Sequence, residues 1–286
     1  MKTVVYYFIF AVLLASCGQS ANTAGKKNIK SKTQQLNIKG SDTELSFTQK
    51  EIEEYLKKNP DASISLTGGG SSVGITALIE GNTDIAMTSR DLTTGETNEF
   101  GEKGGGIKKM IVAYDGLAII VNPANKVDDI TMKQLDDIYT GKIDHWNDLQ
   151  GTNQKMSILS RESSSGTYSY FKEHILEGKS YSSTITQLTS NGQIVESVSQ
   201  SPDAIGYVSL GYVNSKVKVL GISFDGGKTF VEGKIENVKN NSYKIKRPLY
   251  YIFEENNSAK ADPFVNYVLS DSGQKIVETA GFIKVK

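Results

Sequence analysis

From residue 36 to the C-terminus, the sequence alternates short β-rich runs with stretches of helical periodicity. The runs 36–40, 62–67 and 156–161 have the composition of strands. Each run is followed within a few residues by a segment with apolar residues at helical spacing: 41–58, 73–81 and 167–177. Alternating strands and helices form parallel sheets with helices on both faces. The sequence therefore predicts an α/β fold, with residues 92–107 and 236–244 as polar connections.

Composition excludes several classes of protein. The 286 residues contain 32 Lys and Arg against 32 Asp and Glu, whereas a nucleic-acid-binding protein needs a dominant basic face. The single cysteine excludes an internal disulfide and a multi-cysteine zinc site. The only histidines are His145 and His174, so no histidine-rich metal centre is expected. The length fits two domains, and no low-complexity linker separates them.

The N-terminus has the pattern of an export signal. Lys2 precedes an unbroken apolar run over 4–15, which is too short for a membrane span but has the length of a signal-peptide core. The only cysteine, Cys17, follows Leu-Ala-Ser, and this resembles the lipobox of bacterial lipoproteins. We therefore expect 1–16 to be a signal peptide, Cys17 to carry lipid, and 17–35 to be a polar tether. The alternative is an ordinary export signal with an incidental cysteine.

Three turns share one kind of chemistry. The segments 40–44 (GSDTE), 68–72 (GGGSS) and 163–167 (SSSGT) each follow a predicted strand and open a predicted helix. Helix N-termini of this kind offer free amides, hydroxyl donors and a positive dipole end to an anion. Arg161 adds a permanently charged, planar group before the third turn. Any one turn is explained by ordinary capping, and Ser41-x-x-Glu44 fits a capping box, but three together predict an oxyanion site.

Catalytic chemistry is not expected. Ser165 has no neighbour in the sequence that fits a general base, and no nucleotide P-loop pattern is present. No metal-ligand spacing surrounds His174. The Gly-rich segment 104–106 is interpreted as a flexible insertion, and Tyr207 and Tyr212 as packing residues. The sequence therefore predicts a protein that is not an enzyme and that binds neither a metal ion nor a cofactor.

Consecutive blocks of the chain resemble the phosphate-binding proteins of bacterial phosphate ABC importers. They are GSDTELSF, LTGGGSSVGI, TDIAMTSR, IVAYDGLAIIVNP, IYTGKIDHWNDL, SRESSSGTYSYF, AIGYVSLGYV, RPLYYIF and FVNYVLSDSGQKIVETAGF, between about residues 36 and 284. The resemblance implies a periplasmic-binding-protein-like (type II) fold with a ligand cleft between two lobes. We expect lobe 1 to comprise 36–115 and 246–286, and lobe 2 to comprise 116–245, with strand crossovers near 113–116 and 244–247.

The resemblance also implies the residues that contact phosphate. Carried over position by position, with the neighbouring Ser72, Ser89 and Arg90 added, they are Ser41, Asp42, Thr43, Ser71, Ser72, Ser89, Arg90, Arg161, Ser165, Gly166 and Thr167.

The chain departs from the better-known family pattern at two points. Ser89-Arg90 stands where many members have an acidic residue after the third strand, and Ser163 replaces a second acidic residue in the arginine loop. Phosphate is distinguished from sulfate by an acceptor for its remaining proton, and we expect Asp42 to supply it. The alternative is that Asp42 caps its helix or pairs with Arg90. Glu162 is expected to pair with Arg161.

These observations predict an extracytoplasmic, lipid-anchored and monomeric solute-binding protein. It is expected to capture inorganic phosphate and deliver it to the permease of an ABC importer, without binding nucleic acid. The alternatives are a receptor for another tetrahedral oxyanion such as sulfate, a secreted phosphate-ester hydrolase, or a surface interaction protein that keeps the fold.

Overall fold

The computed structural model describes residues 35–104 and 106–285. Its strands are β1 (Leu36–Gly40), β2 (Ile64–Thr67), β3 (Ile85–Thr88), β4 (Ile107–Val121), β5 (Asp129–Thr131), β6 (Ser157–Arg161), β7 (Thr186–Leu188), β8 (Ala204–Ser209), β9 (Lys218–Val219), β10 (Gly221–Ser223), β11 (Val231–Glu232) and β12 (Lys246–Glu254). Its α-helices are α1 (Leu45–Lys58), α2 (Ser71–Ile79), α3 (Thr94–Glu102), α4 (Met132–Thr140), α5 (Gly166–His174), α6 (Asn191–Gln200), α7 (Ile235–Lys239), α8 (Ser258–Val268) and α9 (Asp271–Thr279). Short 3-10 helices are η1 (Asp42–Glu44), η2 (Trp146–Leu149), η3 (Leu210–Tyr212) and η4 (Glu255–Asn257).

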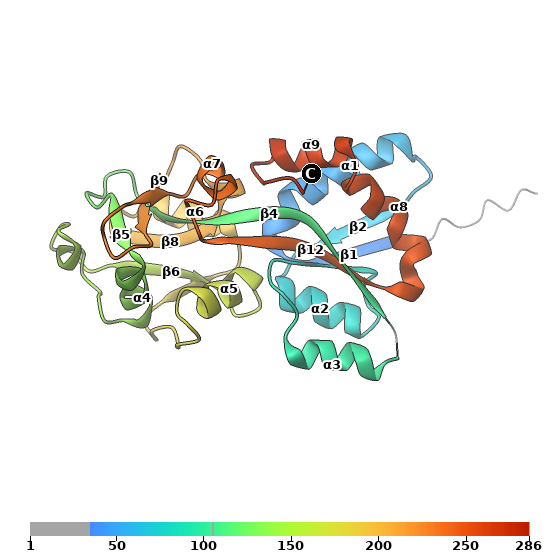
Figure 1. The fold of residues 1–286 in the computed structure, drawn as a ribbon, viewed down its shortest axis with the longest axis horizontal. Helices are drawn as coiled ribbons and strands as arrows, with labels where there is room; N and C mark the ends of the chain where they lie inside the picture. Colours follow the sequence, from blue (N-terminus) through green and yellow to red (C-terminus); the bar gives the residue numbers. More distant parts are fainter. Residues whose placement is uncertain (1–34, 105, 286) are drawn as a thin grey trace, which may run out of the picture. The chain divides into compact units, whose positions relative to one another are not determined.

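The main sheet joins two parallel groups of strands through an antiparallel pair. Its order is β2-β1-β3-β12-β4-β8-β6-β7, with β9 also pairing with β4. Strands β2, β1 and β3 are parallel, as are β8, β6 and β7. The long strands β4 and β12 run antiparallel to each other from one group to the other (Figure 1). A small second sheet has the order β11-β10-β5. The predicted α/β class is confirmed.

Around β2, β1, β3 and β12 the sheet is buried on both faces, because its apolar side chains alternate between two cores. In β12, Leu249, Tyr251 and Phe253 enter one core, whereas Tyr250 and Ile252 enter the other. Helices α1, α8 and α9 cover the first face, and α2 and α3 cover the second (Figure 1). Successive side chains of a strand point to opposite faces of the sheet. A strand therefore contributes apolar side chains to both cores only when nearly all of its residues are apolar.

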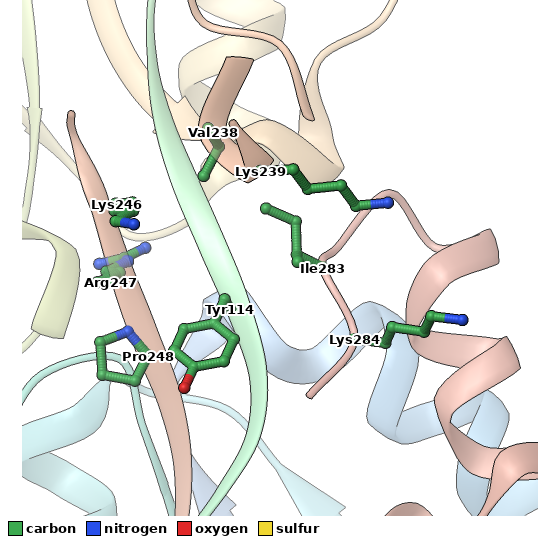
Figure 2. A pocket seen from close by; sticks show the side chains of 8 residues that line it. All are labelled: Tyr114, Val238, Lys239, Lys246, Arg247, Pro248, Ile283 and Lys284. Carbon is green, nitrogen blue, oxygen red and sulfur yellow. The ribbon is translucent and has the colours of Figure 1, made fainter. Parts of the chain in front are cut away.

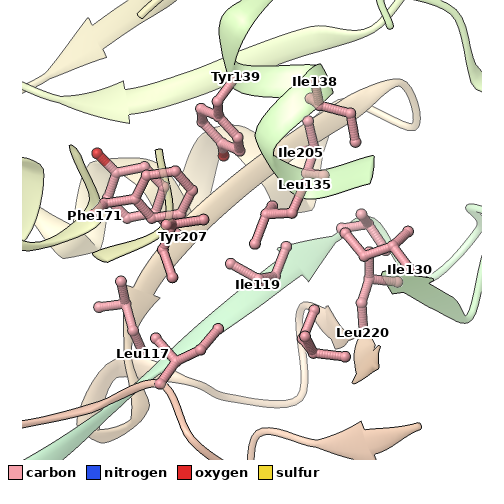
Figure 3. Close-up of a cluster of buried hydrophobic side chains, with 14 of the residues drawn as sticks. Leu117, Ile119, Ile130, Leu135, Ile138, Tyr139, Phe171, Ile205, Tyr207 and Leu220 are labelled. Atoms are coloured by element: carbon pink, nitrogen blue, oxygen red, sulfur yellow. The ribbon is translucent and has the colours of Figure 1, made fainter. Parts of the chain in front are cut away.

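The second group of strands repeats this arrangement around separate cores. Leu117 and Ile119 of β4 enter a cluster with residues of α4 and α5, where the rings of Phe171 and Tyr207 stack at 4.1 Å (Figure 3). Ala118 and Ile120 face the opposite way, toward α6. Two independent pairs of cores, joined by β4 and β12, make the fold a two-lobed one.

Three sequence expectations about local structure were wrong. Residues 94–102, which were predicted to form a loop, form the helix α3. Thr93 and Glu96 form a capping box at the N-terminus of this helix. Residues 235–239 form the short helix α7 within the predicted polar connection. Ser41, predicted to form a capping box with Glu44, makes no side-chain cap bond. The strong Thr93 cap shows that local hydrogen bonding can start a helix where apolar periodicity is weak.

The predictions for the N-terminus lie outside the described residues, including the signal peptide 1–16, Cys17 and most of the tether 17–35. Within the described part of the chain, no helix is both long enough and apolar enough to span a membrane.

Candidate functional site

The predicted anion-binding turns converge at the carboxyl ends of the parallel strands. Strand β1 ends at Gly40, where φ is 142° and an added Cβ would lie 2.2 Å from the Met87 carbonyl oxygen of β3. This contact requires glycine, because any other residue would push the first turn away from the neighbouring strand. The amide of Ser41 then donates to the same Met87 carbonyl at 3.0 Å. The backbone thereby fixes where η1 begins, at the edge where α/β sheets bind ligands.

Ser71 and Ser89 meet the N-terminus of α5. The Ser71 hydroxyl lies 3.4 Å from that of Ser89 and accepts from the Ser89 amide at 3.1 Å. An added Cβ on Gly166 would lie 2.3 Å from Ser71 Oγ and 2.6 Å from Ser89 Oγ. The predicted turns after β2 and β6, which are far apart in the sequence, therefore meet, and Ser89 after β3 joins them.

Arg161, at the end of β6, is buried and has donor nitrogens that make no hydrogen bond among the described residues. Its side chain is 1% exposed, and its Nη2 donates to the Thr189 carbonyl at 2.6 Å. Within the described part of the chain, its Nε and Nη1 have no hydrogen-bond partner. Burial lowers the pKa of Arg161, and the nearby Asp42 carboxylate opposes that shift. A buried cation with two donor nitrogens that make no hydrogen bond is costly by itself and well suited to an anion.

Asp42 links the first turn to Arg161 and to α6. Its Oδ2 accepts from the Asn191 amide at 2.9 Å and from Asn191 Nδ2 at 2.8 Å, and lies 3.4 Å from Arg161 Nη1. All these contacts involve Oδ2, and none involves Oδ1. The alternative that Asp42 pairs with Arg90 is wrong, since Arg90 pairs with Glu96. The expectation that Glu162 pairs with Arg161 is also wrong, because Arg161 pairs with Asp42.

Thr43 and Thr167 connect the turn after β1 to α5, sharing a hydrogen bond at 3.1 Å between their hydroxyl oxygens. Ser165 accepts from the Thr167 amide at 3.1 Å and so caps α5. Thr43, Ser165 and Thr167 are almost fully buried. Their hydroxyls add neutral donors to the charged donors of Arg161.

A second buried arginine was missed by the sequence analysis. Arg247 of β12 donates to Thr43 Oγ1 at 3.3 Å and to the Ser89 carbonyl at 3.3 Å. Its Nη2 also lies 3.0 Å from Asp115 Oδ2, and both side chains are buried. Asp115 accepts in addition from the Ser209 hydroxyl at 2.8 Å. Asp115 interrupts the apolar run 111–121, and a charge inside such a run is the sequence signal that could have found this pair.

Arg90 and Ser72 lie beside the cluster with other partners. The Arg90 guanidinium donates to both carboxylate oxygens of Glu96 at 2.8 and 2.7 Å, and to Ser72 Oγ at 3.1 Å. The Ser72 amide donates to the Ser164 carbonyl at 3.1 Å. Arg90 therefore links Ser72 to Glu96 of α3. The Ser72 amide contacts the turn before α5.

Glu44, the predicted capping residue, is instead a buried carboxyl behind η1. It is fully buried, and both carboxyl oxygens lack hydrogen-bond partners within the described residues. Burial raises its pKa well above the usual value.

The assembled cluster provides arginine, hydroxyl and amide donors together with one carboxylate, Asp42, directed at Arg161. This set of groups suits a small protonated oxyanion. Among the described residues, no group of three or more His, Cys, Asp or Glu side chains is arranged to hold a metal ion.

Comparison with known proteins agrees with this chemistry. A model described as a PBP superfamily domain matches residues 22–272. The phosphate-binding protein PstS of Borreliella burgdorferi is 32% identical over 259 residues, covering 88% of this chain and 90% of that protein. PstS of Bacillus subtilis is 31% identical over 287 residues, covering 96% and 91%. The chain belongs to the family of PstS phosphate-binding proteins.

Solved structures of this family have the same fold. A phosphate ABC transporter substrate-binding protein with bound phosphate from Clostridium perfringens has a TM-score of 0.80 and 36% identity, covering 88% of this chain and all of that one. A phosphate transport receptor from Vibrio cholerae has a TM-score of 0.71 and 30% identity, covering 87% and 99%. The family consists of transporter substrate-binding proteins and not of enzymes.

Proposed function

We propose that this PstS family member captures inorganic phosphate outside the cytoplasm and delivers it to an ABC importer. The observation that carries the proposal is the buried Arg161 guanidinium, whose Nε and Nη1 have no hydrogen-bond partner among the described residues, with Nη1 3.4 Å from the Asp42 carboxylate. Thr43, whose hydroxyl bonds to that of Thr167, follows Asp42, the ion-pair partner of Arg161, and the relatives are phosphate-binding proteins.

The proposed contacts with phosphate come from both lobes. Arg161 Nε and Nη1 donate, together with the hydroxyls and amides of the three turns. The proposed contact residues are Ser41, Asp42, Thr43, Ser71, Ser89, Arg161, Ser165, Gly166 and Thr167. Arg247 is added through its bond to Thr43. Ser72 and Arg90 are proposed to act at the edge of the site, because Arg90 is paired with Glu96.

Asp42 is the proposed acceptor that distinguishes phosphate from sulfate. Its Oδ2 is occupied by Asn191 and Arg161, which leaves Oδ1 for the proton of monohydrogen phosphate. Sulfate has no proton at neutral pH, so it would meet Oδ1 as an unpaired like charge.

Calorimetric titration of the mature protein with phosphate, sulfate and a phosphate monoester tests both points. We expect one phosphate site, sulfate binding at least roughly a hundredfold weaker, and no turnover of the ester. Asp42→Asn should lose most of the preference for phosphate, because its amide can donate to sulfate. Equal binding of sulfate by the unmodified protein would replace phosphate by a general oxyanion, and ester hydrolysis would support the enzyme alternative.

The proposed lobes are 36–115 with 246–286, and 116–245. Support comes from the cores, since the first pair includes Ala113 and Leu249, and the second includes Leu117 and Ile245. The crossovers are then the parts of β4 and β12 near 113–116 and 244–247. A crystal structure with and without phosphate tests this division, and bending within either proposed lobe in place of the crossovers would contradict it.

We further propose that Cys17 carries lipid after removal of 1–16, which would hold a monomeric binding protein at the membrane near its permease. The support is the Leu-Ala-Ser-Cys sequence after an apolar run. Metabolic labelling with a fatty-acid analogue should tag the unmodified protein and not Cys17→Ala. Labelling that survives this substitution would place the lipid elsewhere.

A further inference from the structure

A cavity of about 340 Å³ lies beside the paired strands β4 and β12 (Figure 2). Its wall comes from β4, from the end of α7, from the start of β12, and from the residues after α9. The lining residues are Tyr114, Val238, Lys239, Lys246, Arg247, Pro248, Ile283 and Lys284. This volume lies within the range of small-molecule binding sites.

The cavity is basic, although the chain as a whole has no net charge. Lys239, Lys246 and Lys284 are exposed, and none of them forms an ion pair with another described residue. Figure 2 shows the side chains of Lys239 and Lys284 extending to the same side of the cavity. Among the lining residues there is no acid. The amines of Lys239 and Lys284 are therefore available to an anion.

Two further charged groups lie near these lysines and have other, closer partners. Glu278 pairs with Lys275 at 3.1 Å, and its pKa is lowered first by Lys275, with smaller contributions from Lys284 and Lys239. The Arg247 guanidinium is buried against Asp115.

The other residues that line the cavity are mostly apolar, and backbone hydrogen bonds fix part of this wall. It consists of Tyr114, Val238, Pro248 and Ile283. Tyr114 and Ile283 exchange two backbone hydrogen bonds, at 2.7 and 2.9 Å, which fix the C-terminal segment against β4. Such a wall suits a flat or branched apolar group and offers little to an inorganic oxyanion.

We propose that this cavity binds a small organic anion, with an aromatic or branched aliphatic body and one carboxylate or sulfonate group. The body packs against Tyr114, Val238, Pro248 and Ile283. The anionic group lies between Lys239 and Lys284. The cavity shares Arg247 with the proposed phosphate contacts, since Arg247 lines it and also donates to Thr43. The inference does not depend on phosphate being the transported solute.

Fluorescence titration with 1-anilinonaphthalene-8-sulfonate tests the proposal. The protein is first saturated with phosphate, so that the oxyanion site is occupied. We expect one dye per protein, displaced by benzoate and not by its neutral isostere benzamide. Displacement by both ligands alike, or binding at many sites, would overturn the proposal.

Matched variants test the lining residues. Lys239→Gln with Lys284→Gln should weaken dye binding by roughly three- to tenfold, because each partly solvated charge pair contributes modestly. The control, Lys57→Gln with Lys58→Gln on exposed positions of α1, should leave binding unchanged. Ile283→Trp should fill the cavity and abolish dye binding while phosphate affinity confirms the fold. Equal dye affinity in the lysine pair and its control would contradict the assignment.

Discussion

At the scale of single residues, the site depends on buried charge that is only partly satisfied. Arg161 is held by the Thr189 carbonyl and by an ion pair between Nη1 and Asp42, yet its Nε and Nη1 make no hydrogen bond among the described residues. Leaving buried donors unsatisfied costs about 1–3 kcal/mol or more for charged groups. A bound oxyanion removes this cost, so Arg161 makes the empty site less stable and the occupied site more stable.

Arg161→Met should weaken phosphate binding by about tenfold to a hundredfold. Methionine keeps part of the apolar stem but loses charged hydrogen bonds typically worth about 1.5–3 kcal/mol. Calorimetry measures the affinity, and circular dichroism checks the fold. Lys155→Met, at an exposed lysine, serves as the control. Unchanged affinity in folded Arg161→Met would place the site elsewhere.

Two buried carboxyls lie close behind the first turn. Glu44 has no hydrogen-bond partner for either oxygen among the described residues, and Glu51 accepts from the Tyr251 hydroxyl at 3.2 Å. Burial raises the pKa of both groups well above the usual value. A raised pKa means that the folded state holds protons that the unfolded state releases above about pH 4.3, so stability falls as the pH rises.

Glu44→Gln should therefore flatten the dependence of stability on pH. From about pH 4.5 upward, to the folded-state pKa, the unmodified protein should lose about 1.4 kcal/mol per pH unit through this group, and the variant should not. Urea denaturation at several pH values measures the two slopes. The exposed Glu53→Gln is the matched control on α1. Parallel curves for Glu44→Gln and the unmodified protein would show that Glu44 does not titrate in this way.

At the scale of elements, the site forms where the N-termini of helices lie against the carboxyl ends of strands. The N-terminus of α5 approaches Ser71 at the start of α2 and Ser89 after β3 so closely that Gly166 has no room for a Cβ. The Ser72 amide bonds to the Ser164 carbonyl across the same contact. Position 166 therefore sets how closely these elements approach each other.

Gly166→Ala should reduce phosphate affinity by about tenfold to a hundredfold, because overpacking a close contact costs about 1–3 kcal/mol. The matched control is Gly192→Ala in α6, where an added Cβ would lie 3.8 Å from Ser190 Oγ, its nearest neighbour. Calorimetry of both variants measures the difference. Similar affinities for the two variants would mean that the close approach is not needed for binding.

At the scale of the whole molecule, β4 and β12 carry the chain from one pair of cores to the other. They are paired continuously from Lys246 with Gly116 to Glu254 with Ile107, apart from a shift between Leu249 and Tyr250. Arg247 joins this strand pair to Thr43. A ligand held by turns from both lobes should therefore stabilise the molecule as one unit.

Phosphate at a hundredfold excess over its dissociation constant should stabilise the folded state by about 2.7 kcal/mol. For a chain of this size, that corresponds to a rise in Tm of roughly 5–10 °C. Differential scanning calorimetry with phosphate, and with chloride at matched ionic strength, measures the shift. A rise of the same size with chloride, or in Arg161→Met at the same phosphate concentration, would exclude site-specific stabilisation.

The sequence by itself predicted the α/β class, most strands and helices, and the meeting of the three turns. These predictions succeeded because strand composition, helical spacing and turn chemistry are local properties of the chain. Helix α3 was missed because it rests on the Thr93 cap and buries chiefly one large apolar residue, Phe100. A helix such as α3, whose apolar residues do not recur at helical spacing, is therefore not predicted from the apolar pattern.

Only the tertiary structure decided which charged groups are partners. Asp42 contacts Arg161 and Asn191, more than a hundred residues away, and Arg247 pairs with Asp115 from the neighbouring strand. Nearness in the sequence had favoured Glu162 for Arg161, and a capping role for Glu44. Charge pairing depends on distance in space and on burial, and both are set by how strands of distant sequence are ordered in the sheet. The sequence therefore determined which groups could bind an anion, and the packing of the strands decided which of them face one another.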